Sequence, residues 1–158
     1  MITQGIVMAF LGSAIAIGLA CSGSGMGVGI AGAAAEGVLT EEPEKFGLML
    51  FLSAIPGTQG IYGLLVGFWV LMKTGIFAGV PLPLTLNQGW QIFFACIPVG
   101  VVGFFSGWYQ GKTAAAAIGL VARNPEEVGK ATVMVAMVET YAVFSLLASL
   151  LLFNGINL

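Results

Sequence analysis

One carboxylate stands in an otherwise uncharged stretch near the end of the chain. Glu139 lies in VMVAMVETYAV (133–143), where every other residue is apolar or uncharged. An ionised carboxylate among apolar groups costs several kcal/mol unless it is paired, neutralised or bound to a cation. Its chemistry therefore depends on which side chains the fold brings to it.

The composition indicates a membrane protein. Of 158 residues, 58% are hydrophobic and 8% are charged, whereas a soluble domain carries roughly 25% charged residues. The five basic residues do not cluster, which excludes a nucleic-acid-binding protein. The N-terminus has no basic region, so we expect no cleaved signal peptide. We interpret Cys21 and Cys96, both in apolar stretches, as small packing residues.

Four segments are apolar enough and long enough to cross a bilayer, which takes about 20 residues. They are residues 4–39, 46–72, 89–122 and 127–154. The first and third exceed the bilayer thickness and should tilt or project beyond it. The sequence thus predicts an all-α membrane protein of two helical hairpins, with boundaries at 1–77 for the first hairpin, 78–88 for a connecting loop and 89–158 for the second hairpin.

The two hairpins are tandem copies. A shift of 82 residues aligns the short loops TEEPEKF (40–46) and ARNPEEVG (122–129), and it aligns Gly, Ser, Ala and Pro residues throughout the first and third segments. Both of these segments carry small residues every three or four positions, which allows helix backbones to approach closely. Three basic residues flank the short loops, against Lys73 alone at the other end. This bias predicts cytoplasmic hairpin loops and both termini outside.

The turn of the second hairpin sets the depth of Glu139. It lies about 14 residues past Pro125, or roughly 21 Å along the helix. Counting the same distance back from the turn reaches Gln110, so an amide and a carboxylate share one level of the membrane. Lys112 lies close in depth and would be a rival partner for the carboxylate. It is two residues from Gln110, about 200° around the helix, and should face away.

The first hairpin brings more oxygen atoms to the same level, because the repeat maps Glu139 onto Gly57. Around Gly57, one helix face carries Ile55, Thr58, Gln59 and Tyr62. Pro56 removes a backbone donor and loosens the helix there, which leaves a carbonyl oxygen available. A carboxylate, two amides, a hydroxyl, a phenol and a carbonyl are hard oxygen donors suited to a small hard cation. Any one of the hydroxyls or amides alone would also fit a helix–helix hydrogen bond.

The stretches PGTQGIYG (56–63), YQGKTAAAAIG (109–119), RNPEE (123–127) and VETYAVFSLL (138–147), set in a duplicated hairpin, resemble the proteolipid, or K, subunit of bacterial V-type ATPases. The resemblance covers nearly the whole chain. It implies a ring of identical subunits in the plasma membrane that turns against a stator membrane subunit, with a central-stalk subunit at the cytoplasmic loops. It also implies that the subunit is not itself an enzyme and has no catalytic residue. No cofactor is implied beyond the transported ion.

In sodium-translocating members of that family, the ion is held by side chains matching Thr58, Gln59, Gln110 and Glu139 and by a carbonyl matching Ile55. A tyrosine matching Tyr62 hydrogen-bonds the glutamate. Each of these positions carries the expected residue type here. A proton needs only the carboxylate, so the additional oxygen donors favour Na+ over H+.

Three alternatives remain open on the sequence. The first is a proton-translocating ring of the same type. The second is a small proton-coupled multidrug antiporter, and the third is a structural pore or junction protein.

Overall fold

The computed structural model describes residues 3–158 as helices and short connections. Helix α1 spans Gln4–Glu41, and a single 3-10 turn, η1 (Pro43–Lys45), leads into α2 (Phe46–Ala54). A second turn, η2 (Ile55–Gly57), joins α2 to α3 (Thr58–Lys73). The second half follows with α4 (Leu86–Arg123), η3 (Pro125–Glu127) and α5 (Val128–Asn154). The four predicted spans and the two-hairpin arrangement are confirmed.

The repeat is visible in the backbone at both short loops. Each long helix is followed by a cap residue, Glu42 or Asn124, that precedes a proline, a position that disfavours the α-helical region of the backbone. Glu42 has φ −133° and ψ 70°, and Asn124 has φ −134° and ψ 80°. The two loops therefore turn in the same way, because the same Pro–Glu pair follows each helix.

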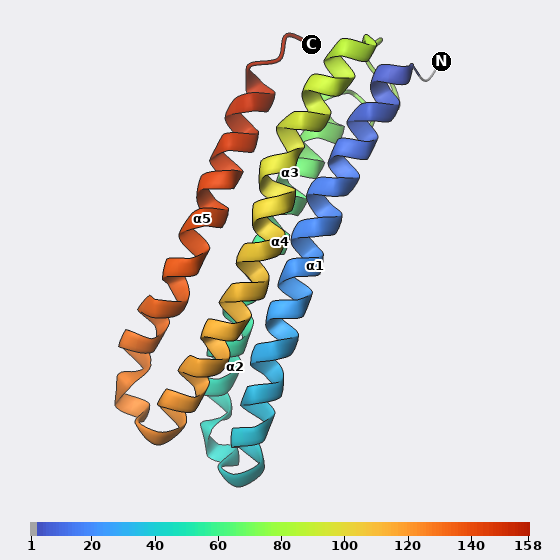
Figure 1. Ribbon diagram of the computed structural model, residues 1–158. Helices are drawn as coiled ribbons and strands as arrows, with labels where there is room; N and C mark the ends of the chain where they lie inside the picture. The colour runs from blue at the N-terminus through green and yellow to red at the C-terminus, as the bar shows by residue number, and fades with distance from the viewer. Residues whose placement is uncertain (1–2) are drawn as a thin grey trace.

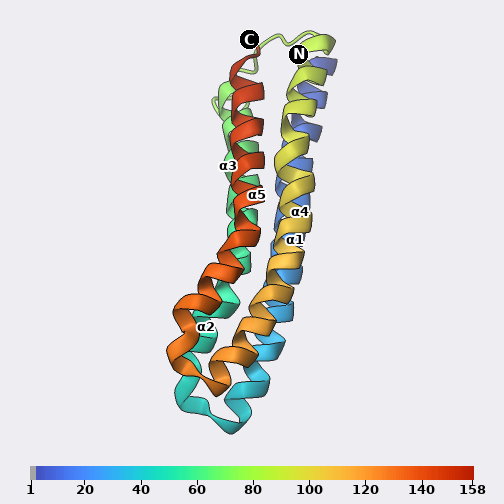
Figure 2. The same ribbon diagram turned by 60° about the vertical axis from the view of Figure 1, so that its left-hand side comes forward.

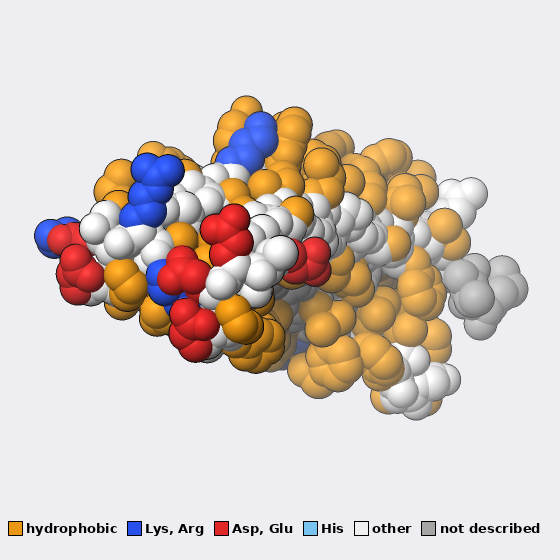
Figure 3. Space-filling view, turned by 90° about the horizontal axis from the view of Figure 1, so that it is seen from below, with side chains coloured by type: hydrophobic (Ala, Val, Ile, Leu, Met, Phe, Trp, Pro, Cys, Tyr) orange, Lys and Arg blue, Asp and Glu red, His pale blue; other side chains and the backbone are white. Residues whose placement is uncertain are grey.

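The helices form two layers. The long helices α1 and α4 lie side by side in one layer, and α2, α3 and α5 lie in the other (Figures 1 and 2). The start of α1, the end of α5 and the α3–α4 connection lie at one end, and the two short loops lie at the opposite end (Figure 1). Acidic and basic side chains gather at the short-loop end, while hydrophobic side chains cover most of the remaining surface in that view (Figure 3).

Glycines bring α1 and α4 into backbone contact. A Cβ atom at Gly107 would lie 2.7 Å from the carbonyl carbon of Gly23, and one at Gly103 would lie 3.0 Å from the Cβ of Ala20. A Cβ at Gly111 would overlap the backbone of Gly27. This tight seam holds the two hairpins against each other.

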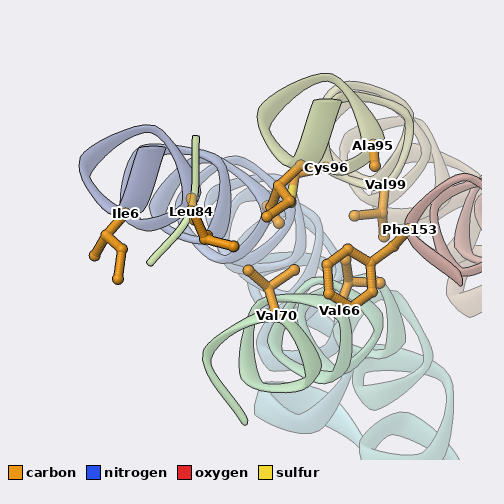
Figure 4. Packing of buried hydrophobic residues seen from close by; sticks show 11 residues of the cluster. Ile6, Val66, Val70, Leu84, Ala95, Cys96, Val99 and Phe153 are labelled. Carbon is orange, nitrogen blue, oxygen red and sulfur yellow. The ribbon is translucent and has the colours of Figure 1, made fainter. Parts of the chain in front are cut away.

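Two apolar clusters fill the space between the layers on either side of the membrane midplane. At the end of the molecule that carries the α3–α4 connection, Val66 and Val70 of α3 pack with Cys96 and Val99 of α4 and with Phe153 of α5 (Figure 4). The other cluster lies toward the short loops and includes Met49, Leu52, Ile118 and Val135. The buried polar side chains of the midplane lie between these clusters.

Lys45 links the two short loops. Its Nζ donates a hydrogen bond of 2.5 Å to the carbonyl oxygen of Ala122 and lies 2.5 Å from Glu42 Oε2. A lysine at the carbonyl end of a helix satisfies a terminal acceptor and complements the helix dipole. The first loop thus caps the long helix of the second hairpin.

The α1–α4 seam predicts that substitution by alanine changes stability differently at two glycines of α4. We expect Gly111→Ala to destabilise the protein by about 1–3 kcal/mol, because the new methyl group overlaps Gly27. Gly119→Ala is the control, since nothing lies within 4 Å of its Cβ position, and alanine should add about 1 kcal/mol of helix propensity there. Thermal unfolding of the purified protein, followed by circular dichroism, measures both. Equal melting temperatures would argue against a seam at this position.

Candidate ion-binding site

The structure places the six residues selected from the sequence in one connected group at mid-depth. Ile55, Thr58, Gln59 and Tyr62 come from the η2–α3 segment, Gln110 from α4 and Glu139 from α5. Gln59 and Gln110 have no exposed surface, while the other four are partly buried. The group therefore joins three helices from both hairpins.

Glu139 receives one hydrogen bond at each carboxylate oxygen. The hydroxyl of Tyr62 donates to Oε1 at 2.5 Å, and Nε2 of Gln110 lies 3.5 Å from Oε2. The Gln110 amide also donates to the carbonyl oxygen of Val135, one turn earlier on α5, at 3.2 Å. Both donors are neutral, so dipoles stabilise the carboxylate. Among residues 3–158, no lysine or arginine forms a salt bridge with it.

The two amides are coupled to each other. Gln59 Nε2 donates to Gln110 Oε1 at 2.6 Å. This bond fixes which end of each amide faces which neighbour: Gln59 Oε1 points toward Thr58 Oγ1 at 3.5 Å, and Gln110 Nε2 points toward the carboxylate. Burial in an apolar surrounding makes such a network costly to leave half-satisfied, which holds it in one arrangement.

The proline of the first hairpin shapes the remaining ligands. Pro56 has no N–H, and the helix tightens to a 3-10 turn over Ile55–Gly57. As a result the Ile55 carbonyl oxygen accepts both the backbone N–H of Thr58 and its hydroxyl, the latter at 3.3 Å. The turn brings the Ile55 oxygen and the Thr58 hydroxyl together beside the Gln59 amide.

Two serines complete the network, and the sequence reasoning did not assign them to the site. Ser24 Oγ accepts the N–H of Gly60 at 2.8 Å and lies 3.5 Å from Gln59 Oε1. Ser106 Oγ accepts from Gln59 Nε2 at 3.2 Å and donates to the Val138 carbonyl at 3.0 Å. These serines occupy equivalent positions in the repeat, and that repetition was the available signal for both.

Lys112 is not a partner of Glu139. Its Nζ lies 4.3 Å from the ring centroid of Trp108 and 4.9 Å from that of Tyr109, one turn back on α4. Within residues 3–158 the two salt bridges are Lys45–Glu42 and Lys130–Glu127, both at the short loops. The lysine faces away from the carboxylate, as its offset from Gln110 predicts.

The donor set suits a hard cation. One carboxylate, two amides, a hydroxyl and a carbonyl belong to one hydrogen-bonded network, in which Gln110 turns its Nε2 toward the carboxylate and its Oε1 toward Gln59. Residues 3–158 hold no cluster of three His, Cys, Asp or Glu side chains. Neutral oxygen donors around a single negative charge match a small monovalent ion better than a transition metal, which selects nitrogen and sulfur ligands.

The chain matches the ATP synthase C-subunit family twice, over residues 11–70 and 93–152. It belongs to that family. The two matches begin 82 residues apart, the same offset that aligns the hairpins. Together with the four apolar spans, membership makes the chain a multi-pass membrane protein.

Three similar proteins are each named as subunit K of a V-type ATPase or an A-type ATP synthase. The chain is 41% identical over 154 residues to the V-type sodium ATPase subunit K of Enterococcus hirae, covering 96% of this chain and 95% of that protein. It is 37% identical over 151 residues to the A-type ATP synthase subunit K of Methanocaldococcus jannaschii, covering 96% of this chain and 64% of that protein. A match to the A-type ATP synthase subunit K of Sulfolobus acidocaldarius is 48% identical over 77 residues, covering 49% of this chain and 71% of that protein.

The amide network predicts a stability effect at Gln59. We expect Gln59→Leu to lower the free energy of unfolding by about 1–3 kcal/mol, because Gln110 Oε1 would lose its donor in a buried site. Gln91→Leu is the control, since Gln91 is an exposed glutamine on α4. Chemical unfolding in detergent measures the difference. If both variants unfold alike, the hydrogen bond between the two amides contributes nothing to stability.

Proposed function

We propose that this chain is a rotor-ring subunit of a rotary V-type ATPase and that it carries Na+ across the membrane on Glu139. The cation is held by the Glu139 carboxylate, the side-chain oxygens of Thr58, Gln59 and Gln110, and the Ile55 carbonyl. Tyr62 orients the carboxylate. The observation that carries the proposal is the position of Glu139, a charge at mid-membrane depth whose partners are neutral oxygen-bearing groups.

The physics of a membrane carboxylate gives the mechanism. A bare carboxylate crosses a lipid-facing position at high cost, whereas a carboxylate that shares its charge with a bound cation does not. Glu139 therefore binds its ion at one access path, turns through the lipid in the bound form, and releases it at another. The Tyr62 hydroxyl keeps one carboxylate oxygen aligned throughout.

The neutral ligands support Na+ over H+. A proton is held by the carboxyl group alone and requires no other oxygen atom. A dehydrated Na+ requires several oxygen ligands to replace its water. Ile55, Thr58, Gln59 and Gln110 form a hydrogen-bonded chain of oxygen-bearing groups that reaches the carboxylate through Gln110, and this supports their assignment as ligands. The match to a sodium ATPase subunit of Enterococcus hirae is consistent with this choice.

The proposal also includes partners and orientation. Identical copies form the ring, a stator membrane subunit faces Glu139, and a central-stalk subunit rests on the charged short loops. The short loops are cytoplasmic and the termini are outside, as the bias of Lys45, Arg123 and Lys130 at that end suggests. The chain catalyses nothing by itself, and ATP is hydrolysed or made by the soluble part of the complex.

Labelling of Glu139 tests the sodium site. In native membranes at fixed pH, we expect added NaCl to slow the reaction of Glu139 with a hydrophobic carbodiimide, because bound Na+ excludes the proton that the reaction needs. KCl at the same ionic strength is the control. Gln110→Leu should weaken the protection by about tenfold or more, since a ligand to a charged group contributes roughly 1.5–3 kcal/mol. Equal rates in NaCl and KCl would favour the proton-translocating alternative.

Removal of the charge tests transport. Glu139→Gln retains an amide that can accept from Tyr62, so we expect the protein to insert and assemble but to lose ATP-driven uptake of radioactive Na+ into vesicles. Glu36→Gln is the matched control, because Glu36 is an exposed carboxylate near the short-loop end of α1. Glu36→Gln should keep full uptake. Uptake that survives in Glu139→Gln would show that another group carries the ion.

A further inference from the structure

We propose that Ser106 of α4 and Ser24 of α1 are positioning residues for Na+ binding, because together they fix which end of the Gln59 amide faces the ion. Neither serine is itself a ligand. Each acts through Gln59, whose oxygen is kept toward Thr58 while its NH2 group is kept toward α4. This inference rests on the proposed function and deepens it, since it adds residues that determine the affinity of the same site.

The Gln59 side chain lies between the two long helices. It comes from α3, in the layer opposite α1 and α4 (Figure 2), and has no exposed surface. It meets Ser24 of α1 at its oxygen and Ser106 of α4 at its nitrogen. Both serines are buried, and they are equivalents in the repeat, 82 residues apart. One duplicated position therefore contacts both ends of a single amide.

The nitrogen end of this amide has two acceptors on α4. Gln59 Nε2 donates to Gln110 Oε1 at 2.6 Å and to Ser106 Oγ at 3.2 Å. The hydroxyl hydrogen of Ser106 is already used, because it is donated to the Val138 carbonyl oxygen on α5 at 3.0 Å. Toward Gln59 the Ser106 hydroxyl can therefore only accept, and it selects the nitrogen end of the amide.

Gln110 adds a second constraint on the same end. Its Nε2 faces the Val135 carbonyl oxygen at 3.2 Å and Glu139 Oε2 at 3.5 Å, which leaves its Oε1 for Gln59. A reversed Gln59 amide would set its oxygen against Gln110 Oε1 and Ser106 Oγ, with no hydrogen between them. Buried acceptors that face one another in this way lose their hydrogen bonds at a cost, so the observed orientation is favoured.

The oxygen end of the amide meets two hydroxyl groups. Ser24 Oγ and Thr58 Oγ1 each lie 3.5 Å from Gln59 Oε1. Ser24 Oγ accepts the backbone N–H of Gly60 at 2.8 Å, which leaves its hydrogen for Gln59. Both contacts at Oε1 are long beside the 2.6 Å bond at Nε2. The Gln59 oxygen therefore keeps lone-pair capacity for a cation, which the NH2 group does not have.

The orientation of Gln59 matters to a cation and not to a proton. A cation is attracted by the amide oxygen and repelled by the hydrogens of the NH2 group. A proton on Glu139 requires no ligand from Gln59. Within residues 3–158 the hydrogen bonds of Ser106 go to Gln59 and to the Val138 carbonyl, not to the carboxylate. Loss of the Ser106 hydroxyl should therefore weaken Na+ binding and leave the protonation of Glu139 unchanged.

Ser106→Ala tests this in native membranes, through carbodiimide labelling of Glu139. We expect the NaCl concentration that halves the labelling rate to rise about threefold to tenfold, the factor that one neutral hydrogen bond contributes. In Na+-free medium the pH dependence of labelling should stay that of the wild type. Ser13→Ala is the matched control and should keep the wild-type NaCl requirement. Ser13 is a buried serine of α1 that likewise donates to a carbonyl oxygen of another helix, that of Gly67 at 3.0 Å.

A double substitution shows whether Ser106 acts through Gln59. In a Gln59→Leu background the amide is absent, so adding Ser106→Ala should change the NaCl requirement by less than about twofold. A shift of the full size in that background would overturn the proposal, because Ser106 would then act independently of Gln59. A Ser106→Ala requirement equal to that of Ser13→Ala would also overturn it. So would an equally large change in the pH dependence, which would indicate a general rearrangement of the site.

Ser24→Ala provides a separate measurement if Ser106→Ala fails to assemble. It removes a donor at the oxygen end of Gln59, so the NaCl requirement should again rise above that of Ser13→Ala. An unchanged requirement in Ser24→Ala would then overturn the positioning role. Absence of Na+ protection in the wild type would refute the ion proposal itself. Wild-type protection that both serine variants retain at the same NaCl concentration would refute the positioning role alone.

Discussion

The arrangement of the midplane depends on one constraint: a carboxylate at mid-membrane depth must be stabilised by neutral groups. In the part of the chain that the structure describes, Glu139 forms no salt bridge, and Tyr62 and Gln110 supply its hydrogen bonds. Each of these donors must in turn be held, because a loose amide in an apolar layer is itself costly. Gln59 holds Gln110, and Ser24 and Ser106 hold Gln59. The network is thus built outward from one charge.

The glycine seam is what makes that network reachable. Gly23, Gly107 and Gly111 bring α1 against α4. A side chain as short as serine connects α1 to α3 only if those helix axes are also close, and Gly60 and Gly63 of α3 permit that approach. The Pro56 turn contributes the other requirement, because it brings the Ile55 carbonyl and the Thr58 hydroxyl to the same point. Small residues on the helix faces and one proline therefore determine both how the helices pack and where the oxygen-bearing groups lie.

The sequence predicted the four spans and most of the residues at mid-depth. The spans followed from length and hydropathy, and the depths of Gln110 and Glu139 followed from counting residues back from a turn. Counting gave the depth of Lys112, and its offset of about 200° from Gln110 gave its direction, which agrees with its position over Trp108 and Tyr109. The roles of Ser24 and Ser106 escaped. A serine in a glycine-rich stripe has the same signature whether it only packs or also binds, and only the position of Gln59 distinguishes the two.

The duplication gives the two hairpins different tasks. Two identical hairpins would give each chain two mid-membrane carboxylates. Here Gly57 is the repeat equivalent of Glu139, and the positions equivalent to Gln110, Gln59 and Tyr62 carry Val28, Tyr141 and Phe144. In the proposed ring, each chain of four helices then carries one ion. For a given number of helices around the ring, half as many ions cross in each turn. The same work per turn is divided among fewer ions, so each ion can be driven against a steeper gradient.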